Sequence, residues 1–89
     1  MAPDFEYNAH TLLRAIYDLA GGDPTTEVMT NEAAHTAGIQ SIQEADALVR
    51  YIRDMGWVDN LGIPENSILR ITPAGIRKAE EGGAPMYPD

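Results

Sequence analysis

The sequence predicts a mainly helical α+β domain, and three observations support this prediction. Residues 30–56 contain two segments with apolar positions at helical spacing, joined through a glycine. Residues 57–71 change to short apolar runs on either side of a loop that contains Gly, Pro and Asn, which is typical of a β-hairpin. A Thr-Pro pair at 72–73 then starts another helix. With an amphipathic N-terminal segment, these elements predict a three-helix core, a β-hairpin and a C-terminal helix.

The size of the chain limits its domain organisation. A length of 89 residues suits one hydrophobic core, so we expect a single domain over residues 1–83. A flexible tail is expected over 84–89, where two prolines follow a glycine pair. The N-terminus lacks the basic and apolar regions of a signal peptide, and no apolar run reaches membrane-spanning length. We therefore expect a cytoplasmic protein with no membrane partner.

The sequence offers no evident catalytic or metal chemistry. It contains no cysteine, which excludes disulfides, a thiolate nucleophile and cysteine-ligated zinc. His10 and His35 lie 25 residues apart, without a carboxylate arrangement of the metal-ligand type. The Gly21-Gly22 pair is not followed by the Gly-Lys-Ser/Thr of a phosphate-binding loop. We therefore expect neither an enzyme nor a bound cofactor or metal.

The first predicted helix spans residues 4–20 and stops at the Gly-Gly-Asp-Pro sequence that follows. His10 is expected on its polar side. Residues 25–29 form a β-leaning connector, with Val28 inward and a short first strand as one interpretation. The predicted inward positions of the helix share one face: Phe5, Ala9, Leu12, Leu13, Ile16, Leu19 and Ala20.

The central helices have recognisable ends. Thr30 is predicted to cap the second helix, and Gly38 to end it, because glycine adopts a left-handed conformation at little cost. Ser41 and Glu44 fit a capping box, in which the hydroxyl accepts from the Glu44 N–H and the carboxylate returns to the Ser41 N–H. The third helix then continues to Gly56. Its predicted inward positions recur at helical spacing: Ile42, Ala45, Leu48, Val49, Ile52 and Met55.

The hairpin and the last helix complete the domain. Short apolar runs predict two strands around a turn at 62–66, with Trp57 as a core side chain beneath the hairpin. Thr72 is the predicted cap of the last helix, which covers residues 74–81. The strand residues are Trp57, Val58 and Leu61 on one side of the turn and Ile68, Leu69 and Ile71 on the other.

Residues 29–81 resemble the winged helix-turn-helix domains of bacterial and archaeal regulators. The resemblance begins with Glu32-Ala33-Ala34 before Ala37-Gly38-Ile39, followed by Ser41 with Leu48 and Ile52. It continues through the Asp54-Met55-Gly56-Trp57-Val58 step into the hairpin and Ile71-Thr72-Pro73-Ala74-Gly75 after it. The resemblance implies that the helix beginning at Ser41 enters the DNA major groove. It also implies that the 62–66 loop, the wing, lies against the neighbouring backbone, and that the protein is a small DNA-binding transcriptional regulator.

The resemblance and the side-chain chemistry give a set of candidate DNA contacts. Glutamine suits an adenine edge, and arginine suits phosphates. Structural interpretations are equally open: Ser41 as a cap only, and the arginines paired with Glu44, Asp46 or Asp54. The candidates lie on the third helix, the turn before it and the second hairpin strand: Gln40, Ser41, Gln43, Ala47, Arg50, Arg53 and Arg70.

The charge of the chain supports a second hypothesis. Fourteen acids against six Lys and Arg give a net charge of −8, and the loop at 62–66 carries Glu65 but no base. Because DNA affinity comes largely from cations that neutralise phosphates, the alternative is an acidic protein–protein interaction module without DNA binding. Lysine-poor, acidic surfaces also occur in proteins of salt-rich cells. For the DNA-binding regulator we expect a homodimer through the first helix, the last helix or the Met86-Tyr87 tail.

Overall fold

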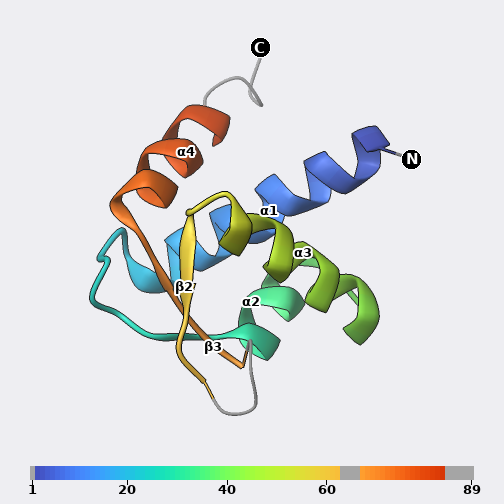
Figure 1. Ribbon diagram of the computed structural model, residues 1–89, viewed down its shortest axis with the longest axis horizontal. Helices are drawn as coiled ribbons and strands as arrows, with labels where there is room; N and C mark the ends of the chain where they lie inside the picture. The colour runs from blue at the N-terminus through green and yellow to red at the C-terminus, as the bar shows by residue number, and fades with distance from the viewer. Residues whose placement is uncertain (1, 63–66, 84–89) are drawn as a thin grey trace.

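The computed structural model describes residues 2–62 and 67–83 (Figure 1). Within these ranges the chain is α+β and mainly helical, as predicted. The helices are α1 (Ala2–Ala20), α2 (Thr30–Ala37), α3 (Ile42–Asp54) and α4 (Pro73–Gly83). The strands are β1 (Val28–Met29), β2 (Val58–Asn60) and β3 (Ile68–Ile71). No helix in this part of the chain is both long and apolar enough to cross a lipid bilayer.

The three strands form one antiparallel sheet in the order β1-β3-β2. Val28 pairs with Leu69 at one edge of β3, and Val58 pairs with Ile71 at the other. The short strand expected near Val28 is therefore confirmed. The two hairpin strands are also confirmed, although β2 is shorter than predicted and contains neither Trp57 nor Leu61. Residues 63–66 of the predicted turn lie outside the described residues.

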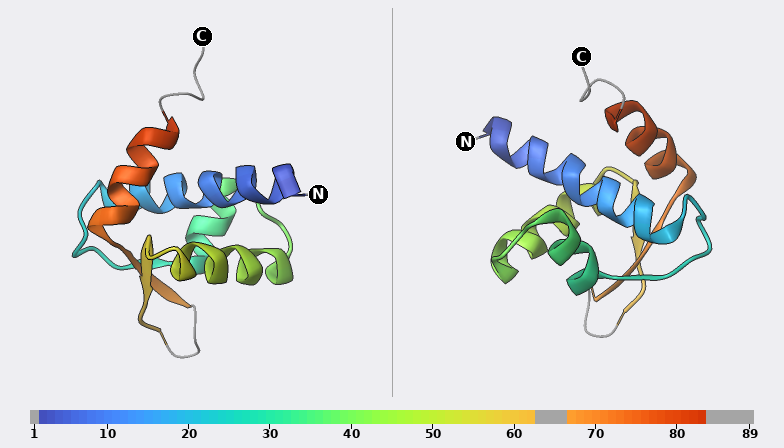
Figure 2. Two further views of the ribbon diagram at one scale, coloured as in Figure 1. Left: turned by 45° about the horizontal axis from the view of Figure 1, so that its top comes forward. Right: turned by 180° about the vertical axis from the view of Figure 1, so that it is seen from behind.

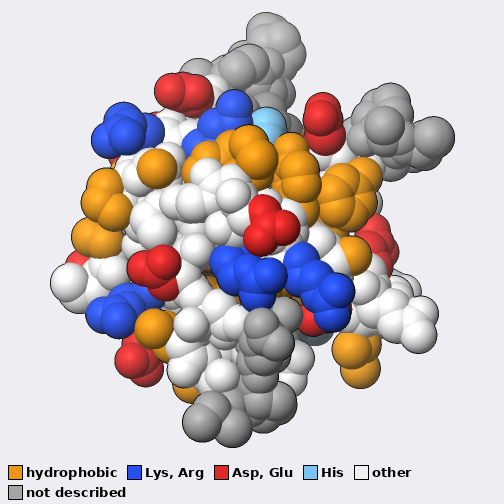
Figure 3. Space-filling view, viewed as in Figure 1, with side chains coloured by type: hydrophobic (Ala, Val, Ile, Leu, Met, Phe, Trp, Pro, Cys, Tyr) orange, Lys and Arg blue, Asp and Glu red, His pale blue; other side chains and the backbone are white. Residues whose placement is uncertain are grey.

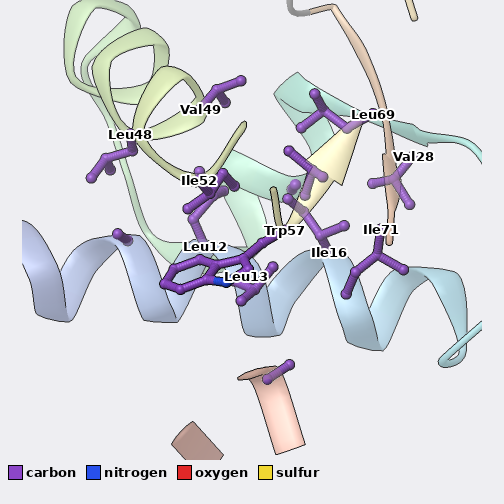
Figure 4. Close-up of a cluster of buried hydrophobic side chains, with 14 of the residues drawn as sticks. Leu12, Leu13, Ile16, Val28, Leu48, Val49, Ile52, Trp57, Leu69 and Ile71 are labelled. Atoms are coloured by element: carbon purple, nitrogen blue, oxygen red, sulfur yellow. The ribbon is translucent and has the colours of Figure 1, made fainter. Parts of the chain in front are cut away.

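The hydrophobic core forms around α1. This helix packs against α2, α3, α4 and the sheet, and Figure 2 shows it lying between α4 and the α2–α3 pair. Leu12, Leu13 and Ile16 of α1 are fully buried, and Figure 4 shows them facing side chains from α3, β1 and β3. The predicted inward face of residues 4–20 is confirmed except at Leu19, which is 38% exposed at the end of the helix.

The turn between α2 and α3 has the predicted glycine but differs in its caps. Gly38 adopts φ 80°, and Ile39 N–H donates to the Ala34 carbonyl at 2.9 Å to close α2. Ser41 Oγ accepts from Glu44 N–H at 3.2 Å, so half of the capping box is confirmed. The other half is not observed, because the Glu44 carboxylate accepts from Asn8 Nδ2 of α1 at 2.9 Å. The Glu44 carboxylate thus bonds to α1 rather than to the Ser41 N–H.

The predicted capping role of Thr30 is wrong. Thr30 is the first residue of α2 rather than its cap, and Met29 holds the cap position. The backbone explains the shift, because Thr30 N–H donates to the Ser67 carbonyl at 3.0 Å and thereby extends the β1–β3 pairing into the first residue of the helix.

The sequence predicts more inward positions on α3 than the structure shows, and the two incorrect ones lie at the ends of the segment. Its central positions, such as Leu48 and Ile52, are buried, whereas Ile42 is 84% and Met55 49% exposed. On a helical projection, Ile42 and Met55 each lie about 70° from the centre of the buried stripe. Both residues stand where the neighbouring elements no longer cover the helix. Leu61, predicted as a strand residue, lies just after β2 and is 40% exposed.

Trp57 is the predicted core side chain beneath the hairpin, and it is 9% exposed. Its ring makes edge contacts with Tyr51 and His10, at centroid distances of 6.1 and 5.7 Å. Lys78 Nζ of α4 lies 5.5 Å from the ring centroid. The expected polar position of His10 is therefore wrong: its side chain is partly buried against the indole, because α4 and Trp57 cover that side of α1.

The position of His10 predicts a pH dependence of stability. Desolvation by burial, and then the Lys78 charge, lower the pKa of His10 below its ordinary value of 6.5, while Glu6 opposes the shift. The unfolded chain therefore binds the proton more tightly, so acidification favours unfolding. We expect the unfolding free energy to fall as the pH drops from 6.5 towards the lower folded-state pKa, and to show no His10 contribution to its pH dependence above this window.

Urea denaturation at a series of pH values measures this effect. His10→Gln should flatten the stability profile across the window, and His35→Gln, on the exposed side of α2, is the matched control. A His10→Gln profile that retains the wild-type slope would assign the pH dependence to other groups.

Candidate nucleic-acid interface

The solvent-facing side of α3 is the candidate interface. Gln43, Ala47 and Arg50 recur at spacings of four and three residues, so they lie along one line of the helix. All three are exposed, and the buried side of α3 faces the core. The packing of α3 against α1 thus leaves its Gln43–Ala47–Arg50 face uncovered.

The turn before α3 adds two polar side chains to the interface. Gln40 and Ser41 are both exposed. The Ser41 hydroxyl oxygen accepts the Glu44 N–H, which confirms the capping role, and a hydroxyl acting as acceptor can still donate its proton elsewhere. A contact from Ser41 or Gln40 to a base stays a prediction.

The arginines of α3 lie beside carboxylates. Arg50 Nε is 3.1 Å from Asp46 Oδ2, and Arg53 Nη2 is 3.6 Å from Asp54 Oδ1. The expected pairing of these arginines along the helix is confirmed. Exposed pairs of this kind contribute about 0–1 kcal/mol, so a phosphate can compete for the guanidinium at small cost.

Arg70 belongs to a different part of the site. It lies on the central strand β3, is partly buried, and is in register with Asp59 of β2. The structure therefore places the candidate residues on the α2–α3 turn, on α3 and on the sheet. In the view of Figure 3, basic side chains lie near the centre with acidic ones among and around them, and they form no continuous basic patch on the visible face. Part of the loop expected to act as the wing, 63–66, lies outside the described residues, as does the 84–89 tail.

A groove of about 610 Å³ lies beside the leading turn of α3. It runs between α2, the α2–α3 turn, α3 and the tip of the sheet, and its lining includes Met29, His35, Ile42, Asp46 and Ser67. Sequence reasoning missed this groove because it placed Ile42 in the core. The available signal was the position of Ile42 at the first helical residue and at the margin of the apolar stripe.

The described residues contain no cluster of three or more His, Cys, Asp or Glu side chains suited to a metal ion. Comparison of the chain with protein-family models, curated proteins and solved structures finds no significant match.

Proposed function

We propose that this protein is a winged helix-turn-helix domain that binds double-stranded DNA and acts as a small transcriptional regulator. The observation that supports the proposal best is the exposed Gln43–Ala47–Arg50 face of α3, which follows α2 after a glycine turn. The antiparallel sheet, with β2 and β3 as its hairpin, is compatible with a wing next to that helix. Fold alone does not establish function, so the proposal must be tested at these side chains.

In the proposed complex, α3 lies in the major groove with its N-terminal half closest to the bases. Gln43 would pair with an adenine edge, and the methyl group of Ala47 would contact a thymine methyl. Gln40 and Ser41 would donate to the backbone or to a base at the start of the helix. Arg50, Arg53 and Arg70 would contact phosphates, which position the helix without specifying sequence.

The affinity of this interface for DNA depends on a balance of charges. The net charge of −8 repels DNA at long range, and this repulsion is screened beyond about 8–10 Å near physiological salt. Short-range contacts from three arginines then decide the affinity. If each neutralises one phosphate, log K should fall with log salt at a slope of about −3.

Two substitutions on α3 should shift DNA affinity in opposite directions. Arg50→Ala removes a phosphate contact and should weaken binding about tenfold, close to the lower end of the range for hydrogen bonds to charged groups. Asp46→Asn removes the carboxylate that pairs with Arg50 and should strengthen binding by a few-fold, because the guanidinium becomes available and a local negative charge is lost. Fluorescence anisotropy of a labelled random duplex at about 50 mM salt measures both effects.

The Arg14–Asp18 pair of α1 provides matched controls. It has the same i,i+4 spacing and the same 3.1 Å separation as Asp46–Arg50, but on another helix. Arg14→Ala and Asp18→Asn change the net charge identically and should leave affinity nearly unchanged. Equal effects at the two pairs would show that net charge, rather than a contact made by Arg50, changes the DNA affinity. No binding by the wild-type protein at low salt would reject DNA binding.

A further inference from the structure

The groove beside α3 is flanked by two conspicuously exposed apolar side chains. Ile42, the first residue of α3, is 84% exposed, and Met29, at the junction of β1 and α2, is 58% exposed. Both line the groove, together with the buried or partly buried apolar side chains of Ala34, Ile39 and Ala45. Apolar groups gathered around a concave surface mark a binding site more specifically than scattered exposed ones do.

The charge around the groove restricts its occupant. Among the described lining residues, Asp46 is acidic and none is Lys or Arg. Arg50, which is not one of them, lies 3.1 Å from the Asp46 carboxylate. The exposed Glu32 directly follows the lining residue Asn31 on α2. The whole chain carries a net charge of −8, so an acidic segment or a second copy of the same chain approaches against repulsion.

We propose that this groove docks a short segment of another protein, which inserts an apolar side chain between Met29 and Ile42 and carries lysine or arginine beside it. The apolar anchor would supply most of the affinity by covering Ile42 and Met29. The basic residues would favour this partner over acidic ones by steering its approach. The inference is independent of DNA binding, because it depends on apolar side chains outside the proposed phosphate contacts.

The position of the groove has a regulatory consequence. Gln40 and Ser41 belong both to the groove lining and to the proposed DNA interface. A segment seated between Met29 and Ile42 would therefore cover the leading turn of α3. If the chain also binds DNA, the two ligands should compete.

Selection from a random peptide library tests the proposal without assuming a partner sequence. Peptides long enough for about four helical turns are selected on the full chain and counter-selected on the Met29→Ser/Ile42→Ser variant. The enriched peptides should share an apolar anchor next to Lys or Arg. Synthetic versions should bind Ile42→Ser about tenfold more weakly than wild type, and their amide shift changes should cluster at residues 29–46.

Tyr7→Ser is the matched control, since Tyr7 is 60% exposed on α1 and does not line the groove. It should bind the selected peptides as wild type does, and both single variants should retain wild-type melting because both positions are exposed. Any of four results would overturn the proposal. No peptide is enriched, or the enriched peptides carry Asp or Glu in place of Lys or Arg beside the anchor. The peptides bind Ile42→Ser as tightly as wild type, or their amide shift changes lie outside residues 29–46. Self-association of the free chain that Ile42→Ser abolishes would instead assign the groove to a second copy.

Discussion

Gly75→Ala should destabilise the protein by about 3 kcal/mol or more, in the upper range of overpacking effects. A Cβ at position 75 would overlap the Trp57 carbonyl oxygen and lie 2.9 Å from Ile71 Cγ1. In an open helix the same change would stabilise by about 1 kcal/mol, because alanine is the better helix former. The close contact between the start of α4 and the backbone at Trp57 reverses the expected sign.

The junction around Gly75 has little freedom to relax. Thr72 Oγ1 donates to the Gly56 carbonyl at 2.6 Å and accepts from Gly75 N–H at 3.0 Å. Thr72 N–H donates to the same Trp57 carbonyl at 3.0 Å. Moving α4 away from an added methyl would therefore break hydrogen bonds that cap this helix and join it to the end of α3.

Urea denaturation followed by circular dichroism measures the loss. Gly38→Ala is the informative control, because Gly38 has φ 80° and open space where its Cβ would be. That variant should lose only about 1–2 kcal/mol, the cost of a left-handed conformation. A Gly75→Ala protein as stable as wild type would show that α4 shifts freely.

Ile52→Ala should cost about 2–5 kcal/mol, whereas Ile42→Ala should change stability by less than about 0.5 kcal/mol. The two substitutions remove the same atoms from the same helix. Ile52 is completely buried in the core between α1 and the sheet, whereas Ile42 is 84% exposed. The difference in unfolding free energy is therefore a direct measure of burial.

This pair also separates folding from binding. If Ile42→Ala melts as the wild type does, a loss of peptide affinity in an Ile42 variant belongs to the groove. If Ile42→Ala is destabilised as strongly as Ile52→Ala, Ile42 packs into the core, and neither the groove nor its proposed partner stands. Chemical denaturation of the two variants and the wild type decides between these outcomes.

Much of the fold could be predicted because local chemistry fixes it. Gly38 ends α2 through its positive φ, Ser41 caps α3, and Thr72 caps α4, and each of these signals acts within a few residues of the chain. The central apolar positions of each helix and strand were also predictable. They lie near the middle of their stripes, where any neighbour will cover them.

The sequence by itself determined the order of the elements, most of their ends and the polar character of the exposed face of α3. Tertiary structure alone decided which marginal residues are covered. Asn8 of α1 donates to the Glu44 carboxylate, Trp57 packs against His10, and the described chain leaves Ile42 84% exposed. Periodicity gives a direction around a helix, but burial depends on what packs there, and those neighbours come from distant parts of the chain.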